Sequence, residues 1–310
     1  MNSATREAFG AALVELGAMN PDVVSLDADL AGATKSAGFK KAFPERFFDM
    51  GIAEADMVST AAGLASAGKI PFASSFSVFI VDRALDQVRN SVCYPRLNVK
   101  LVGSHAGPSC GEDGGTHQAM EDIAVMRSLP EMCVVVPADD VEARAAVLAA
   151  AEYDGPMYLR VARLASPTVY NKDSYSFDLL HGDIICDGDD LTIVACGMMV
   201  GRALEAADLL ADQGIRATVV NMHTIKPIDA ELLEECARRT GHIITVEEAS
   251  VVGGLGSAVC ETLAERYPVP VRRIGVPDVF GRSGEGSQML DYYRLNKEHI
   301  VEVAHEMLGR

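Results

Sequence analysis

The sequence predicts an α/β protein made of two doubly wound domains, each built around a parallel sheet. Strand-like apolar runs alternate with helical stretches along nearly the whole chain, and this alternation is typical of helices that cover both faces of a parallel sheet. A polar stretch at residues 166–188 interrupts the alternation, which then restarts. Because 310 residues suffice for two hydrophobic cores, we expect domains at residues 1–165 and 189–310, joined by a linker at 166–188.

The first half contains five apolar runs of strand length separated by helical patterns. The chain opens on a helical pattern, without the apolar region of a signal peptide. The expected strands are residues 23–27, 70–74, 99–103, 133–136 and 157–161, and the expected helices are 54–67, 82–93, 116–126 and 141–152. The second half supplies strands at 191–195, 217–221, 242–246 and 271–274, and helices at 200–212, 230–239, 255–266 and 296–308.

The net charge and the cysteine pattern argue against several classes of function. A formal charge of −17 argues against nucleic acid or an anionic membrane as the main partner, and no apolar run is long enough to span a bilayer. The seven cysteines are scattered and form no Cys-x-x-Cys pair, which is typical of reduced thiols in a cytoplasmic protein.

Chemically capable side chains follow several of the expected strands. Asp29 comes after the first strand, Phe76 after the second, His105 after the third and Arg163 after the last. Because ligands bind beyond the carboxyl ends of parallel strands, the sequence predicts one site at this edge of the first sheet.

The loop at residues 104–118 is the densest part of that edge, with four glycines, two histidines and two acids. Glycines let a backbone approach a ligand closely, and His117 would be uncharged near the start of the expected helix. The alternative is a structural loop capped by Thr116, with its histidines bonded to backbone.

Two stretches carry a family resemblance. Gly111-Glu-Asp-Gly-Gly-Thr-His117-Gln, with His105 twelve positions before His117, resembles the transketolase signature. Phe48-Asp-Met-Gly-Ile-Ala-Glu54-Ala-Asp-Met resembles that family's thiamine-diphosphate pyrimidine-binding domain, and Thr245-Val-Glu247 followed by Gly253-Gly-Leu-Gly256 resembles its C-terminal domain. The resemblance implies a pyrimidine-binding domain followed by a transketolase C-terminal-like domain.

The family's metal-diphosphate motif, Gly-Asp-Gly with a later asparagine, does not occur. The chain therefore resembles the C-terminal subunit of a split transketolase. That resemblance implies two-carbon ketol transfer between sugar phosphates in carbohydrate metabolism, such as the pentose phosphate pathway. It also implies thiamine diphosphate, with Mg²⁺ or Ca²⁺ held by an N-terminal partner subunit, and an α₂β₂ heterotetramer. The isolated chain is expected to fold, bind the cofactor poorly and be inactive.

The resemblance assigns the cofactor residues. It implies that Glu54 bonds the pyrimidine ring nitrogen and activates the cofactor, that Phe76 and Phe79 flank that ring, and that Asp29 lines the thiazolium side. A one-residue insertion follows Phe79, and the family's third aromatic would fall near Asp82.

The resemblance also assigns the substrate residues, His105, Asp113, His117 and Arg163. His117, also a catalytic candidate, and Asp113 would bind hydroxyls of the donor sugar, whereas His105 and Arg163 would face the acceptor and its phosphate. Arg160 competes with Arg163 for the phosphate. Ala106-Gly107 replaces the family's Asp-Ser, so the usual acceptor is not assured.

Three other interpretations remain open. The chain could belong to a related thiamine diphosphate enzyme, either deoxyxylulose-phosphate synthase or the β subunit of a 2-oxoacid dehydrogenase. It could also be a non-catalytic fragment that binds a partner. In the second domain, residues 253–256 resemble an anion cradle, although packing and dimerisation are the favoured interpretation.

Overall fold

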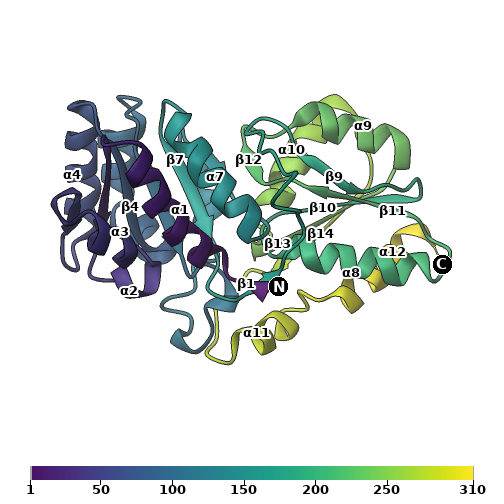
Figure 1. Ribbon diagram of the computed structural model, residues 1–310. Helices are drawn as coiled ribbons and strands as arrows, with labels where there is room; N and C mark the ends of the chain where they lie inside the picture. Colours follow the sequence, from purple (N-terminus) through teal and green to yellow (C-terminus); the bar gives the residue numbers. More distant parts are fainter. Residues whose placement is uncertain (1, 310) are drawn as a thin grey trace.

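The computed structural model describes residues 2–309 and contains two α/β units side by side (Figure 1). The first unit holds a seven-stranded sheet in the order β12-β6-β7-β5-β4-β2-β3. Its strands are parallel apart from β12, which is antiparallel to β6. They are β2 (Val23–Asp27), β3 (Phe47–Asp49), β4 (Ile70–Phe76), β5 (Lys100–Ser104), β6 (Cys133–Val135), β7 (Met157–Val161) and β12 (Thr224–Lys226).

The second unit holds a five-stranded sheet in the order β14-β13-β10-β11-β9. Its strands are β9 (Asp183–Cys186), β10 (Leu191–Ala195), β11 (Ala217–Asn221), β13 (Ile243–Ser250) and β14 (Val271–Val276). All pairs are parallel apart from β9, which runs antiparallel along β11. A short pair, β1 (Asn2–Ser3) with β8 (Ser166–Pro167), lies between the units.

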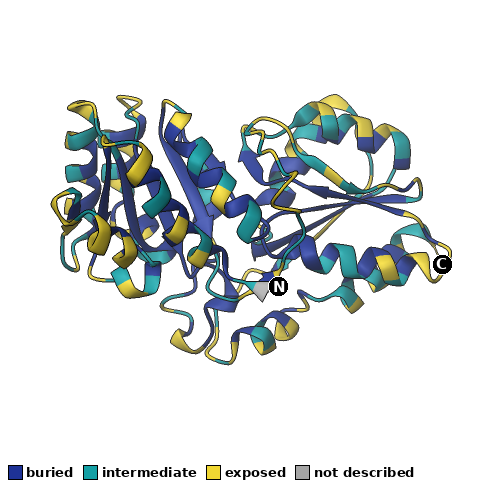
Figure 2. Ribbon diagram, in the orientation of Figure 1, coloured by how far each residue is buried: buried dark blue, intermediate teal, exposed yellow. Residues whose placement is uncertain are grey.

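Helices cover both faces of each sheet. In the first unit, α1 (Thr5–Met19), α3 (Ala37–Ala42) and α7 (Asp140–Glu152) pack on one face, whereas α4 (Glu54–Ser66) and α6 (Asp122–Ser128) pack on the other. Neighbouring strand residues such as Leu101 and Val102 belong to the hydrophobic cores on opposite faces of the sheet, because side chains alternate along a strand. Buried strands and outward-facing helix surfaces are visible in Figure 2.

In the second unit, α8 (Met199–Ala211) and α12 (Lys297–Leu308) cover one face, while α9 (Ala230–Thr240) and α10 (Leu255–Arg266) cover the other. The remaining α-helices are short: α2 (Ala31–Thr34), α5 (Leu85–Gln87) and α11 (Gly286–Tyr292). One hydrophobic core continues from the first unit into the second through Val136, Met222 and Ile225. Within residues 2–309 no helix is long and apolar enough to cross a membrane.

The predicted two-domain α/β class is confirmed, and each expected strand is present to within a few residues. The domain bounds stay a prediction. The expected linker at 166–188 contains the short strands β8 and β9, which were not expected, and β12 of the second half completes the first sheet. Short strands of this kind are recruited by a neighbouring sheet edge rather than by a local pattern.

Two expected helices differ from the structure. In place of the expected 82–93 helix the chain forms a π-helical turn at Phe79–Arg83, α5 and a second π-helical turn at Val88–Cys93. Such turns are how a helix accommodates an inserted residue. The 116–126 helix begins only at Asp122. His117 therefore lies in a loop, and the argument that a helix N-terminus acts on His117 was wrong.

Candidate active site

Four rings lie together at the carboxyl edge of the first sheet. Phe76 ends β4, and its ring stacks on His105, which follows β5, with centroids 4.0 Å apart. Phe79 stacks beside Phe76 at 5.7 Å, and His117 meets Phe79 edge-on at 5.2 Å. The fold therefore brings four of the predicted residues into one aromatic cluster, as the parallel-strand rule requires.

His105 is buried and held in a strained backbone conformation with φ of 59°. Its ring Nδ1 shares a hydrogen bond of 2.7 Å with the Ser104 hydroxyl, and its Nε2 contacts Arg6 Nη1 at 2.9 Å. Burial, then the nearby positive charge of Arg6, lowers the pKa of His105 to about 3. The ring is therefore neutral at physiological pH, and Nε2 can accept a hydrogen bond.

Glu54 is the first residue of α4 and its side chain is only 3% exposed. Arg83 Nη1 donates hydrogen bonds to both Glu54 oxygens, at 3.2 and 3.3 Å. The same guanidinium lies over the Phe79 ring, 3.9 Å from its centroid. A buried carboxylate is thus joined to the aromatic cluster through Arg83.

Arg160 and Arg163 have separate surroundings. Arg160 is buried, forms an ion pair with Asp122 at 2.7 Å and donates to the Glu248 carbonyl. Arg163 is partly exposed and donates to Asp113 at 2.9 Å and to the Cys110 carbonyl at 2.7 Å. Since strand side chains alternate, the two arginines serve different environments, and Arg163 is the one that faces the candidate site.

Arg6 is a site residue that the sequence reasoning missed. It lies in the first turn of α1, donates to the Ala33 carbonyl and contacts His105, and it forms no ion pair within residues 2–309. The Ala162 amide donates a hydrogen bond to Thr5 Oγ1, and this bond anchors the turn beside the end of β7. An arginine in the first helix gives no signal of this position in the sequence.

Asp29 is not hydrogen-bonded to the cluster within residues 2–309. It follows β2 with φ of 61° and is exposed, and its backbone amide donates to Asp49. No hydrogen bond joins its carboxylate to the other predicted site residues in the part of the chain described. The buried carboxylate of this loop is instead Asp27, which accepts from Leu30, Thr34 and Ser36.

The glycines of the 104–118 loop approach the second unit of the chain. A Cβ added at Gly107 would lie 2.5 Å from the Glu248 carbonyl, and one at Gly115 would lie 2.7 Å from the Gly281 carbonyl. A Cβ added at Gly114 would likewise be too close to the Ser283 side chain. The loop therefore needs these three glycines for packing, and Gly114 and Gly115 also line the cavity described below. That these glycines let a ligand approach the backbone stays a prediction.

The second unit also fills its own anion cradle. The Glu247 carboxylate accepts hydrogen bonds from the amides of Leu255 and Gly256 at the start of α10. Burial raises the pKa of Glu247 to about 7. The glycines at 253–256 therefore bind an internal carboxylate, consistent with the packing interpretation.

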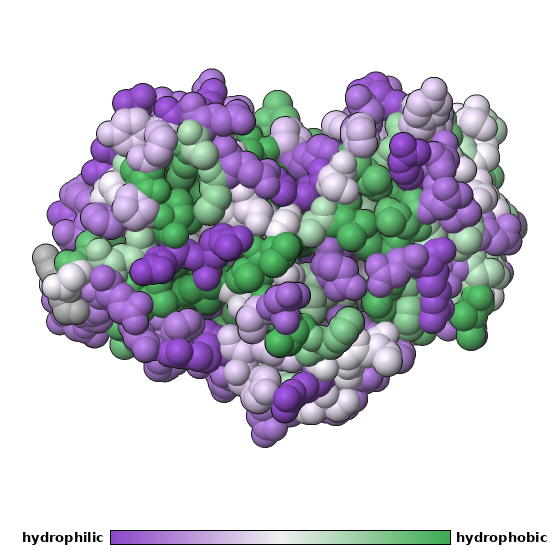
Figure 3. All heavy atoms as spheres, turned by 180° about the vertical axis from the view of Figure 1, so that it is seen from behind, coloured by the Kyte–Doolittle hydropathy of each residue, from purple (hydrophilic) through white to green (hydrophobic). Residues whose placement is uncertain are grey.

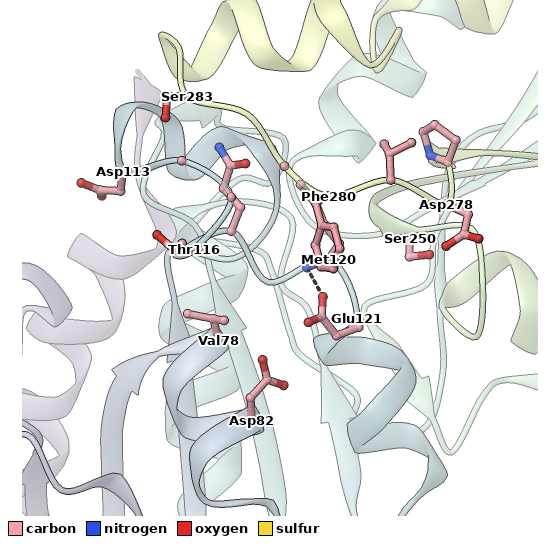
Figure 4. Close-up of a pocket in the computed structure, with 16 residues that line it drawn as sticks. Val78, Asp82, Asp113, Thr116, Met120, Glu121, Ser250, Asp278, Phe280 and Ser283 are labelled. Carbon is pink, nitrogen blue, oxygen red and sulfur yellow. Dashed lines mark hydrogen bonds between the residues drawn. The ribbon is translucent and has the colours of Figure 1, made fainter.

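A cavity of about 830 Å³ lies beside the cluster, between the units (Figure 4). Val78 and Asp82 line it from the first unit, and Asp278 and Phe280 from the loop after β14. Burial, then the charges of Glu121 and Asp122, raises the pKa of Asp82 to about 6. Asp113 is the predicted site residue that lines this cavity. Glu54 and the four rings lie outside its lining, so the cavity and the chemical cluster are adjacent features.

Within residues 2–309, one group of side chains could offer ligands to a metal ion. It consists of Glu142, Asp183 and His223, whose possible ligand atoms lie within 4.8 Å of one another. The Glu142 oxygens already accept from the Ala138 amide, Tyr175 and Asn221. Burial raises the pKa of Glu142 to about 7. These donors make the group a hydrogen-bonded junction between the two units.

Two family patterns together cover most of the chain. "Transketolase, pyrimidine binding domain" matches residues 2–168, and "Transketolase, C-terminal domain" matches residues 180–300.

Relatives and a solved structure match at full length. A "Putative transketolase C-terminal section" of Methanocaldococcus jannaschii is 47% identical, covering 96% of this chain and 94% of the relative. The "6-deoxy-6-sulfo-D-fructose transketolase subunit SqwH" of a Clostridium species is 44% identical, covering 98% and 94%. A "Split gene transketolase, inactive beta4 tetramer" superposes with a TM-score of 0.92 at 52% identity, covering 99% and 98%.

Proposed function

On the premise that this chain belongs to the transketolase family, we propose that it is the C-terminal subunit of a split transketolase. It transfers a two-carbon ketol unit between sugar phosphates with thiamine diphosphate, as an aldehyde/ketone transferase that works only with a partner subunit. The observation that carries this proposal is the buried Glu54 carboxylate beside the ring cluster of Phe76, Phe79, His105 and His117.

The residues fit the pyrimidine half of that cofactor. An aromatic ring with a protonatable nitrogen needs a carboxylate to bond the nitrogen and apolar faces to stack on. Glu54 is buried, and its side-chain hydrogen-bond partner among the described residues is Arg83. The Arg83 guanidinium in turn lies over the Phe79 ring. Thiamine diphosphate, when bound, supplies the nucleophilic carbon and the electron sink of the reaction.

Glu54 and the histidines have distinct tasks in this proposal. Glu54 holds a proton at the pyrimidine ring nitrogen. His117 and Asp113 bind hydroxyls of the donor, and the neutral His105 ring, whose Nε2 accepts from Arg6, faces the acceptor. Phe76 keeps His105 in place by stacking on it.

Two arginines recognise the phosphate of the acceptor. Arg163 is already neutralised by Asp113 and, more distantly, by Glu112. Arg6 has no carboxylate partner within the described residues and contacts His105. We therefore assign Arg6 the closer phosphate contact, with Arg163 as its neighbour across a small cavity of about 220 Å³ that both residues line.

The partner subunit supplies the diphosphate and metal side. The motif for Mg²⁺ or Ca²⁺ is not in this sequence, and the junction at Glu142 is hydrogen-bonded to its own chain. Exposed apolar side chains near the candidate site, Ile52, Val279 and Phe280, favour a covering partner. The reverse face also carries apolar areas over both units (Figure 3), which favours further self-association in an α₂β₂ assembly.

The test uses the chain assembled with a partner subunit that carries the Gly-Asp-Gly motif. With hydroxypyruvate as donor, we expect carbon dioxide release coupled to ketol transfer, and no turnover by either subunit alone. Glu54→Ala should abolish turnover in the assembled complex, while Glu45→Ala, an exposed acid of the same unit, should not. Acyl transfer that depends on a 2-oxoacid, or full activity of Glu54→Ala, would overturn the proposal.

One relative is named for 6-deoxy-6-sulfo-D-fructose, and Ala106-Gly107 departs from the family's polar pair. Gly107 packs against Glu248, which leaves no room for a side chain at that position. A panel of acceptor aldoses and their phosphates would therefore identify the substrate, with the phosphate preference lost in Arg6→Met.

A further inference from the structure

Arg83 lies between the two side chains that the proposed function gives to the pyrimidine ring. Its Nη1 donates to both Glu54 oxygens, at 3.2 and 3.3 Å, and its guanidinium carbon lies 3.9 Å from the Phe79 ring centroid. Arg83 ends the π-helical turn that begins at Phe79. Residues four apart lie on the same side of such a turn, so one guanidinium reaches both groups.

These two contacts are the ones that a bound pyrimidine ring would make. A guanidinium is planar and cationic, donates hydrogen bonds to carboxylates and stacks on aromatic faces. It therefore imitates a protonated aminopyrimidine. Stacked groups lie about 3.5–4 Å apart, and the Arg83 guanidinium carbon lies 3.9 Å from the Phe79 ring centroid. A ring stacked on the same face and bonded to Glu54 needs the same space.

We propose that Arg83 is an internal competitor for the cofactor's pyrimidine subsite, which leaves Glu54 and Phe79 when the aminopyrimidine binds. This inference rests on the proposed function. Arg83 has 48% of its side chain exposed, whereas Glu54 has 3%. The arginine can therefore move out into solvent, while the carboxylate stays in place.

The arrangement has a physical reason. A buried carboxylate without a partner is costly, and pairing it with Arg83 removes that cost. The pairing also means that the cofactor binds only the fraction of molecules in which Arg83 has moved away, which weakens its apparent affinity.

The experiment measures thiamine diphosphate binding to the assembled complex by isothermal titration calorimetry at saturating Mg²⁺. Arg83→Leu keeps the apolar stem and removes the guanidinium, and Arg83→Lys keeps the charge without the plane. We expect the Kd of Arg83→Leu to fall by about tenfold, with Arg83→Lys between it and the wild type. Arg89→Leu is the matched control, because Arg89 bonds Asn90 rather than Glu54, and its Kd should equal that of the wild type.

The outcomes separate the two proposals. An unchanged or weaker affinity of Arg83→Leu, in a complex whose wild type binds the cofactor, overturns the competition and leaves the proposed function standing. A wild-type complex that binds no thiamine diphosphate overturns both. A crystal structure of the loaded complex checks the geometry directly, since Arg83 still bonded to Glu54 beside the bound pyrimidine contradicts the inference.

Discussion

The Glu248 carboxylate, in the second unit of the chain, accepts a hydrogen bond of 2.8 Å from the backbone amide of Ser109. Both groups are buried, and 139 positions separate them in the sequence. The second unit therefore fixes the loop that carries Asp113 and His117. Besides the packing and dimerisation role expected for it, the second unit thus also holds a loop of the candidate site.

Replacing Glu248 should loosen that loop without unfolding the chain. Glu248→Ala leaves the Ser109 amide buried without an acceptor, at a cost of about 1–3 kcal/mol. Glu248→Gln keeps a carbonyl oxygen and should recover much of the loss. Hydrogen exchange read by mass spectrometry should show faster exchange over residues 107–118 in Glu248→Ala. Unchanged exchange in that peptide would mean that the loop does not depend on Glu248.

Adding one methyl at Gly107 should destabilise the protein. Gly107 has φ of 70°, and a Cβ there would lie 2.5 Å from the Glu248 carbonyl. We expect Gly107→Ala to lower the free energy of unfolding by about 1–3 kcal/mol in urea denaturation. Gly63→Ala is the control: Gly63 lies within α4 with no atom near its Cβ position, and the change should be neutral or stabilising by about 0.5–1 kcal/mol. Equal effects at both positions would contradict the packing argument.

His105 should make the protein sensitive to acid. Its pKa is about 3 in the folded chain and about 6.5 in an unfolded chain. Below about pH 6.5 the unfolded state takes up a proton that the folded state refuses, so stability falls as the pH drops towards about 3. Between pH 7 and 5 this loss is about 2 kcal/mol.

His105→Gln and His105→Phe should both lose less stability than the wild type over that interval. Urea denaturation at pH 7, 6 and 5 checks the slope, and using two replacements separates titration from packing. A slope equal to that of the wild type in both variants would show that the histidine is protonated in the folded protein.

Replacing Arg160 should lower the stability of the protein, whereas replacing Arg163 should mainly affect its activity. Arg160→Met leaves Asp122 buried without its cation and should cost about 3–5 kcal/mol. Arg163→Met removes a partly exposed pair with Asp113 and should change stability by less than about 1 kcal/mol. In the assembled complex, Arg163→Met should raise the KM for the phosphorylated acceptor. The reverse pattern would restore Arg160 as the phosphate ligand.

Local patterns were sufficient for the regular strands and for the residues that follow them. Apolar runs predict β2, β4, β5 and β7, and parallel strands place their carboxyl ends at one edge. Phe76 and His105 come together for that reason. The strands β9 and β12 were missed, because each is paired by a sheet built from distant residues.

Sequence alone determined the family resemblance, the candidate residues and their common edge, since these depend on residue type and on the short period of strands and helices. Only the tertiary structure decided which arginine faces the site, that Arg6 joins it, and that the loop glycines meet the second unit. It also placed Arg83 on Glu54. Contacts of this kind depend on how two sheets and their loops pack in three dimensions, which no local period encodes.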